Sequence, residues 1–176
     1  MYKQTKQMSN QKIYALVDRS YEDLMEKAQD NLWKKHLIIH GDPNSGKSKL
    51  IRKLLKGKNY HNATLSGLKT FPKGFYKQHP KDRLDIDFLY FKDVGTKLSP
   101  EEFYGFTTAF PVQLKPHSAC AFIAPRLVLE YCSELPIEKL NNQSLKRRFH
   151  IINTNTISYK EIIHFLIKWN NNEQLS

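Results

Sequence analysis

The sequence predicts an α/β fold of three layers, in which short helices flank a central, mostly parallel sheet. Three apolar runs have the length and composition of buried strands, at residues 36–40, 88–91 and 126–129. The first run ends at a glycine loop, and the segment behind that loop, Lys47 to Leu55, carries its apolar residues in helical register. Strand, loop and helix in this order indicate that strands and helices alternate along the chain.

Length and composition are those of one compact domain. The chain has 176 residues, of which 40% are hydrophobic and 26% charged, and a domain of this size needs neither disulfides nor a structural metal to bury a core. Cys120 and Cys132 form neither a CxxC pair nor a zinc pattern, so reduced thiols in an intracellular protein are expected. No apolar run has membrane-spanning length and the start lacks a signal-peptide pattern, so we expect no membrane association.

The charge balance is strongly basic. Lys and Arg number 28 and Asp and Glu number 17, which gives a net charge of 28 − 17 = +11. A field of this sign concentrates polyanions, and nucleic acid is the commonest polyanion in a cell. The alternative is a lysine-rich, solvated surface without such a partner, because net charge alone says little about partners.

Three segments are expected along the chain. Residues 1–32 form a basic segment followed by a helix, since apolar residues recur at helical intervals from about Ile13 to Trp33. Residues 33–157 form the core domain. Residues 158–176 form a C-terminal helix and a polar tail.

Within the core, four further segments have local signals. Residues 56–83, with glycines, prolines and lysines, are predicted to be loops around one short strand. Ser99-Pro100-Glu101-Glu102 has the order of a helix start, with a serine cap, then proline and acids in the first turn. Residues 110–115 and 119–124 predict two short strands around a hairpin turn, and residues 144–152 predict another short element.

The loop at 41–48 matches the pattern GxxxxGK[ST] of a phosphate-binding loop. Its glycines let backbone N–H groups turn towards phosphates, and the helix behind it directs its positive end at the anion. Lys47 is expected to contact the β- and γ-phosphates, and Ser48 to coordinate Mg²⁺. We therefore predict a site for ATP and Mg²⁺ formed by Gly41, Asp42, Pro43, Asn44, Ser45, Gly46, Lys47 and Ser48.

A carboxylate for the metal is expected at the end of a neighbouring strand, and Asp93 follows the apolar run 88–91. Many ATPases carry two acids at this point, one for the metal and one to activate water, whereas this chain has Lys92 beside Asp93. Either Asp93 holds Mg²⁺ and the base lies elsewhere, or Asp93 is the base and Lys92 has replaced the metal ligand. A solvated residue at a strand end is the remaining alternative.

Four segments follow one another in a characteristic order: the strand with Asp93, then residues 111–115, 122–129 and 144–152. This order resembles the superfamily 3 helicases, the AAA+-related motor domains of viral replication proteins. It is most similar to the Rep proteins of small circular single-stranded DNA viruses and related plasmids, and the resemblance covers roughly Trp33 to Ile152.

The resemblance implies an AAA+-like P-loop NTPase fold and an ATP-dependent helicase that acts in replication. It implies single-stranded DNA as the partner, with RNA also possible, and a homo-oligomer, expected to be a hexamer. For a viral protein the expected location is the host nucleus or cytoplasm.

The resemblance also implies roles for individual residues. Lys115 corresponds to the basic residue of a central hairpin that contacts the DNA backbone, and His117 belongs to the same turn. Arg147 and Arg148 correspond to an arginine finger that reaches the γ-phosphate bound by a neighbouring subunit, where a guanidinium stabilises charge on the transferring phosphoryl group. Without the resemblance, ordinary surface charge explains these residues as well.

A second departure, besides Lys92, concerns the residues for hydrolysis and not the nucleotide-binding loop. Family members carry a polar residue, usually asparagine, at the end of the strand after the hairpin, whereas Cys132 or Ser133 stands near that place here. Three functions are therefore weighed: a DNA motor, a P-loop module that binds nucleotide or nucleic acid but hydrolyses slowly, and an RNA-virus helicase of the same superfamily. In the motor, the catalytic residues are expected to be Lys47, Asp93, Arg147 and Arg148.

Overall fold

A five-stranded parallel sheet forms the centre of the molecule. The computed structural model describes residues 10–64, 87–95, 98–114 and 121–171. The sheet has the order β2-β3-β6-β1-β7, and every neighbouring pair is parallel. Its strands are β1 (His36–His40), β2 (Tyr60–Asn62), β3 (Phe88–Val94), β6 (Arg126–Tyr131) and β7 (Phe149–Asn153). The predicted α/β fold is confirmed, with a central sheet that is parallel throughout.

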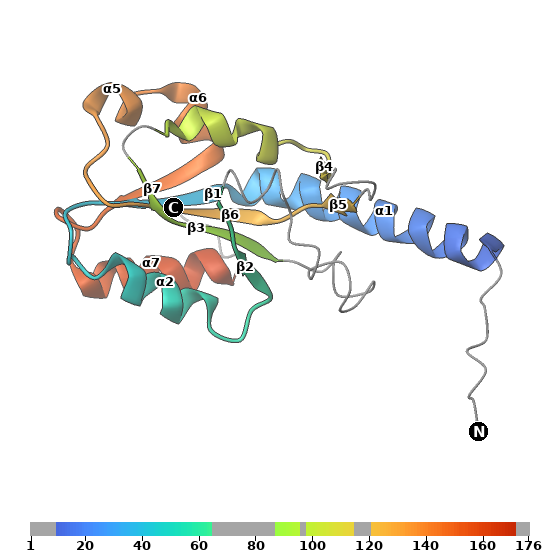
Figure 1. Ribbon diagram of the computed structural model, residues 1–176. Helices are drawn as coiled ribbons and strands as arrows, with labels where there is room; N and C mark the ends of the chain where they lie inside the picture. The colour runs from blue at the N-terminus through green and yellow to red at the C-terminus, as the bar shows by residue number, and fades with distance from the viewer. Residues whose placement is uncertain (1–9, 65–86, 96–97, 115–120, 172–176) are drawn as a thin grey trace.

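Helices cover both faces of the sheet and make the predicted three layers. Figure 1 shows α2 and α7 on one face, and α5, α6 and the yellow-green helix η1 on the other. The helices are α1 (Asn10–Lys34), α2 (Lys47–Leu55), η1 (Pro100–Phe106), α5 (Ile137–Leu140), α6 (Gln143–Arg148) and α7 (Tyr159–Asn170). Over the residues described, no helix is long and apolar enough to cross a membrane.

The alternation of side chains along the strands divides the core into two clusters. On β6, Leu127 and Leu129 pack with Phe103 and Leu145 of η1 and α6, whereas Val128 packs on the other face with α2 and α7. All of these strands except β2 therefore contribute apolar side chains to both layers, because successive residues point to opposite faces. This is why these four strands are short, nearly continuous apolar runs in the sequence.

Two helices begin at a serine side chain that caps them. Ser158 caps α7 in a reciprocal capping box with Glu161. The Ser99 hydroxyl accepts a hydrogen bond from the N–H of Glu101 at the start of η1, which confirms the predicted start, although the helix is of the 3-10 type.

The predicted hairpin strands are present outside the central sheet. β4 (Val112–Leu114) and β5 (Ala121–Ile123) form a separate antiparallel pair. The turn between them, with Lys115 and His117, lies outside the described residues. Most of the predicted loop region at 56–83 also lies outside them, while β2 is the short strand expected there.

Candidate nucleotide-binding site

The loop between β1 and α2 has a conformation that requires two glycines. Gly46, which directly precedes α2, has φ 87° and ψ 7°, in the left-handed region that favours glycine. Gly41 has φ 139°, and a Cβ atom there would lie 2.3 Å from Oγ1 of Thr154. The Gly46 carbonyl accepts hydrogen bonds from the N–H groups of Lys49 and Leu50, at 3.1 and 3.0 Å. The loop thus leads directly into the N-terminal turn of a helix, where an anion binds favourably.

Lys47 lies folded over the loop rather than extended into solvent. Its side chain is buried, and its Nζ donates to the carbonyls of Gly41 at 2.9 Å and Asp42 at 2.5 Å. It also lies 3.2 Å from the Ser45 hydroxyl. Within the ranges the structure covers, no carboxylate lies within 4.0 Å of this ammonium. A buried cation whose partners are all neutral oxygens is suited to receive an anion.

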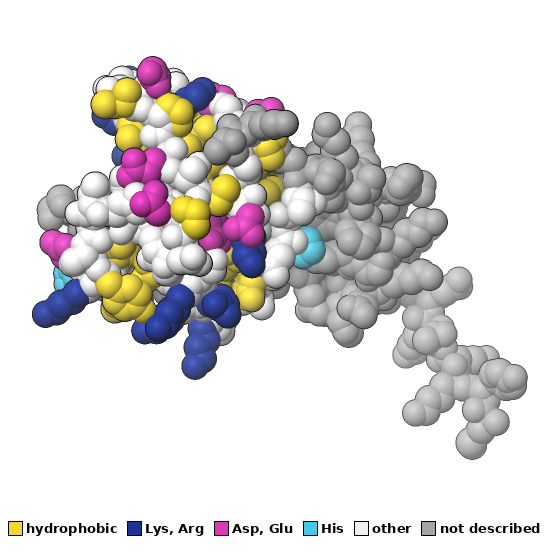
Figure 2. All heavy atoms as spheres, turned by 60° about the vertical axis from the view of Figure 1, so that its left-hand side comes forward, with side chains coloured by type: hydrophobic (Ala, Val, Ile, Leu, Met, Phe, Trp, Pro, Cys, Tyr) yellow, Lys and Arg dark blue, Asp and Glu magenta, His cyan; other side chains and the backbone are white. Residues whose placement is uncertain are grey.

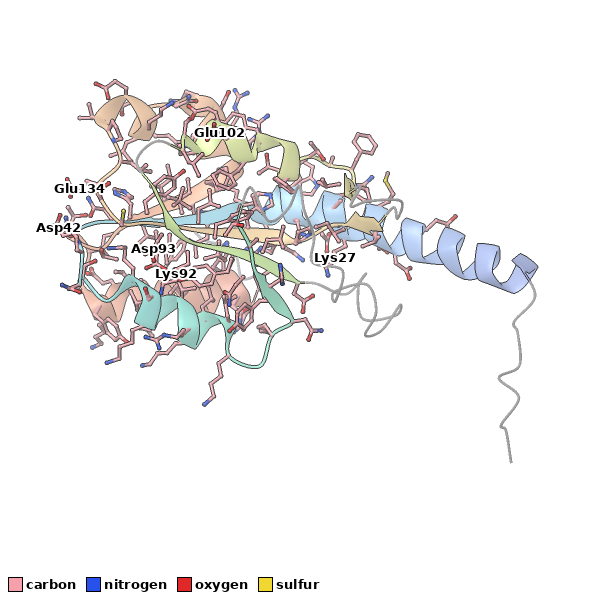
Figure 3. The ribbon with its side chains drawn as sticks, viewed as in Figure 1. Lys27, Asp42, Lys92, Asp93, Glu102 and Glu134 are labelled. Carbon is pink, nitrogen blue, oxygen red and sulfur yellow. The ribbon has the colours of Figure 1, made fainter. Side chains whose placement is uncertain are left out.

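The turn after β7 is hydrogen-bonded to the loop. The hydroxyls of Thr154 and Ser45 are 2.6 Å apart, and Asn155 Oδ1 accepts a 3.0 Å hydrogen bond from the backbone N–H of Asp42. Asn155 in turn donates to Glu134 at 2.8 Å, and Figure 3 shows Asp42 and Glu134 at the same end of the sheet. Nothing in the loop's own sequence points to these residues. Thr154 and Asn155 contact the loop because β7 runs parallel to β1 and both strands finish at the same end of the sheet.

The first turn of α2 is joined to β6 through Ser48. The Ser48 hydroxyl donates to Oε1 of Glu130 at 2.5 Å, and the Tyr90 hydroxyl donates to Oε2 of the same carboxylate. Glu130 is buried, with 3% of its surface exposed. Burial, followed by the hydrogen bond to Glu130, raises the pKa of Tyr90, so this hydroxyl keeps its proton.

The sequence does not predict Glu130 as a site residue, because it follows directly after the apolar run that ends at Leu129. Its position two residues after Val128 was the available signal. Residues two apart on a strand point to the same face, and Val128 faces α2.

Asp93 lies on β3 as predicted, but β6 separates that strand from β1. The register shifts between Phe91 and Val94, and Asp93 within this bulge has φ 50°. The carboxylate is 62% exposed and lies 3.9 Å from the Lys92 ammonium. It is close enough for its charge to contribute to the raised pKa of Tyr90. In Figure 3, Lys92 and Asp93 lie apart from Asp42 at the end of the sheet.

The two arginines lie far from this chain's own loop. They end α6, and the next residue, Phe149, pairs with His36 at the start of β1, whereas the loop follows the end of β1. Four residue steps of a strand place the two positions about 13 Å apart. The Arg148 guanidinium lies 4.5 Å from the centre of the Tyr104 ring, and Arg147 is exposed.

His40 ends β1 directly before the loop and carries no charge near neutral pH. Burial lowers its pKa, and the Lys47 charge lowers it further against the opposing effect of Glu134. Its Nδ1 accepts a 3.2 Å hydrogen bond from the N–H of Leu135. Beyond β6, Cys132 is an exposed free thiol and Ser133 is half-buried.

The residues present fit a nucleoside triphosphate with Mg²⁺. Lys47, the loop N–H groups and the helix start would hold phosphates, while Ser48 and a carboxylate would hold the metal. The described residues contain no group of three or more His, Cys, Asp or Glu side chains that could hold a metal. Mg²⁺ in phosphate sites takes only one or two carboxylates and keeps several waters, so one carboxylate beside Ser48 meets this requirement.

No protein-family model and no curated protein sequence matches the chain. Among solved structures, it is similar to a crystal structure of JCV helicase bound to a substituted acetamide, with TM-score 0.43 and 15% sequence identity. The alignment covers 89% of this chain and 56% of that chain, so this chain spans little more than half of that helicase chain. The parallel sheet with helices on both faces, and the glycine loop between β1 and α2, give the chain a P-loop NTPase-like α/β fold.

Proposed function

We propose that this protein is an ATP-dependent motor domain of the helicase type that acts on single-stranded DNA in replication. The observation that carries the proposal is the buried Lys47 ammonium, held by neutral oxygens within a glycine loop at the start of a helix. The motif order further favours a relationship with superfamily 3 and its Rep proteins. Such a protein would work inside the cell, in the host nucleus or cytoplasm if its source is a virus.

The nucleotide contacts follow from the loop. The backbone N–H groups of the loop, which all its residues except Pro43 carry, and the Lys47 ammonium would bind the phosphates, and Ser48 would bind Mg²⁺. Two carboxylates are candidates for the metal: Asp93, predicted from the sequence, and Glu130, which is bonded to Ser48. When bound, the ion neutralises charge that develops on the β- and γ-phosphate oxygens.

The arginines support a shared active site. Arg147 and Arg148 precede β7, at the opposite end of the strands from the loop. One folded chain therefore cannot bring them to the γ-phosphate of a nucleotide bound at its own loop. A neighbouring subunit in a homo-oligomeric ring would supply them, and a hexamer is the ring that the motif order favours. Arg147 is the better candidate, because Arg148 is already stacked on Tyr104.

Charge supports a polyanionic partner. Figure 2 shows lysine and arginine side chains gathered along the lower edge of one face, where α2 lies in Figure 1. We propose that Lys115 and His117 of the hairpin contact the DNA backbone, as the motif order suggests. Contacts to phosphate do not distinguish DNA from RNA by base, so an RNA partner remains compatible. The exposed basic residues of α2 and the residues after it are Lys49, Arg52, Lys53, Lys56 and Lys58.

Hydrolysis and strand separation test the motor directly. Wild-type protein is expected to hydrolyse ATP, faster with single-stranded DNA, and to unwind a forked duplex. Lys47→Ala should abolish both activities, while Lys49→Ala, which alters an exposed lysine of the same helix, should retain the ATPase rate measured without DNA. A wild-type rate no higher than that of Lys47→Ala would overturn the motor function.

A second candidate is a nucleotide-binding module that hydrolyses ATP slowly. It is favoured by β3, where Lys92 occupies a position at which many ATPases carry an acid and Asp93 lies in an exposed bulge. If Lys92 limits turnover, Lys92→Asp should raise the hydrolysis rate by at least about tenfold. An unchanged rate in a folded Lys92→Asp variant would reject this explanation.

A further inference from the structure

Glu130 is a buried carboxylate whose hydrogen-bond partners are both neutral. Ser48 donates to one oxygen and Tyr90 to the other, and 3% of the residue is exposed. No lysine, arginine or histidine side chain in the part of the chain described lies within 4.0 Å of it. The nearby cation, Lys47, directs its ammonium to the carbonyls of Gly41 and Asp42. Buried carboxylates are normally paired with a cation or bound to a metal.

The position of Glu130 follows from strand order and from side-chain alternation. β6 lies between β1 and β3 and runs parallel to β1, so it finishes at the end of the sheet where the glycine loop begins. Glu130 pairs with Ile39, the second-last residue of β1, and points to the face covered by α2. The first turn of α2 therefore places the Ser48 hydroxyl directly against this carboxylate.

The geometry at Ser48 suits a hard cation. A hydroxyl that donates its proton to a carboxylate keeps its lone pairs for another partner. Oxygen atoms from a hydroxyl and a carboxylate are the ligands that Mg²⁺ prefers in proteins. Asp93 is in a less suitable place, since it is 62% exposed and has the positive Lys92 beside it at 3.9 Å.

We propose that Glu130, rather than Asp93, is the carboxylate that binds the Mg²⁺ of the nucleotide together with Ser48. Tyr90 is then a positioning residue, because its hydroxyl fixes the second oxygen of the carboxylate without contacting the ion. This inference rests on the proposed binding of ATP to the glycine loop. It assigns the metal to β6, a strand from which the sequence predicted no metal ligand.

The test is the Mg²⁺ dependence of nucleotide affinity, measured by fluorescence titration with a methylanthraniloyl-ATP probe in Mg²⁺ and in EDTA. Wild type should bind at least about tenfold more tightly in Mg²⁺. Glu130→Gln keeps the size and an acceptor oxygen but loses the charge. It should bind equally in both buffers with its EDTA affinity retained, whereas Asp93→Asn should keep the wild-type ratio.

Three results would overturn the inference: a wild-type ratio in Glu130→Gln, loss of the ratio in Asp93→Asn, or no binding by wild type in either buffer. The last of these would overturn the proposed function as well, which distinguishes it from the first two. If Glu130→Gln does not fold, Glu130→Asp keeps the charge on a shorter side chain. Its ratio should fall by at least about threefold, and an unchanged ratio would contradict the assignment. Mn²⁺ electron paramagnetic resonance with bound ADP gives a readout independent of affinity, and its signal should change in Glu130→Gln alone.

Discussion

The hydroxyl of Ser48 donates to the buried carboxylate of Glu130 at 2.5 Å, across 82 residues of sequence. This hydrogen bond joins the first turn of α2 to the end of β6. It places a negative charge within the predicted phosphate site, next to the residue expected to bind Mg²⁺. The glycine loop can be recognised from its own sequence, whereas its contact with Glu130 depends on the order of the strands in the sheet.

Arg126 is expected to be a main determinant of stability. Its guanidinium lies 3.5 Å from the centre of the Trp169 ring and donates to the carbonyls of Trp169, Lys34 and Lys35 at 3.2–3.3 Å. Arg126→Lys loses the planar fork and should lower the free energy of unfolding by about 2–4 kcal/mol. Urea denaturation measures this loss. Arg52→Lys, on an exposed helix face, should change stability by less than about 0.5 kcal/mol, and equal effects of the two variants would refute the role of Arg126.

Gly41→Ala is expected to lower the stability by more than the cost of placing alanine at a positive φ. A Cβ at Gly41 meets Thr154 Oγ1 at 2.3 Å, whereas Gly57, also at positive φ, has nothing within 4 Å. Gly57→Ala should cost about 1–2 kcal/mol, and Gly41→Ala at least about 1 kcal/mol more, because the turn after β7 must move. Thermal unfolding measures both variants. Equal losses of stability in the two variants would mean that the Thr154 side chain moves aside at no measurable cost, and would contradict this prediction.

Stability should fall as the pH drops below 6.5, because of His36. Burial, and to a smaller extent the Arg126 charge, lowers the pKa of His36 to about 3. The unfolded chain takes up the proton near pH 6.5 and the folded chain does not, so stability present above pH 6.5 is lost between pH 6.5 and 3. Between pH 7 and 5 the loss from His36 is about 2 kcal/mol.

A matched variant isolates this effect. His36 accepts a 2.9 Å hydrogen bond from the N–H of Leu127, and the side-chain oxygen of His36→Asn can accept the same bond without titrating. Denaturation of both proteins at pH 7 and pH 5 should show a fall in stability that is smaller by about 2 kcal/mol in His36→Asn. Parallel stability curves would exclude His36 as the cause.

Arg147 is expected to act on the nucleotide of a neighbour. Lys47→Ala and Arg147→Ala should each be inactive alone, and an equal mixture should recover up to about a quarter of the wild-type ATPase rate through interfaces with both residues intact. Arg147→Ala should keep the wild-type affinity for ATP. Arg148→Ala, which loses the stacking on Tyr104, should reduce stability instead. No recovery on mixing, with rings present by size, would contradict action between subunits.

Local sequence patterns were sufficient for much of the fold. The strands at 36–40, 88–91 and 126–129 were predicted because buried parallel strands are short apolar runs, and each is present with bounds extended by at most three residues. The start of α7 at Ser158 was predictable because capping depends on residues within one turn. The glycine loop was recognised for the same reason, since its conformation depends on its own glycines and on the helix behind it.

The rest of the site depends on which strands are neighbours. Glu130, Thr154 and Asn155 contact the loop because β6 and β7 flank β1, and no local pattern specifies that order. The bulge at Lys92 and Asp93 arises from pairing with β6, so the exposure of Asp93 could not be read from the run before it. Sequence reasoning therefore identified the glycine loop but not the residues that other strands bring into contact with it.

Calorimetric titration with ATP and Mg²⁺ tests the central claim, that the glycine loop binds a nucleoside triphosphate. Wild type should bind at one site per chain, and Lys47→Ala should bind at least about tenfold more weakly, because the loss of a charge-assisted contact costs more than about 1.4 kcal/mol. Lys49→Ala, two residues further along α2, should stay within about twofold of wild type. Absence of binding by wild type, or equal affinity in Lys47→Ala, would contradict the account.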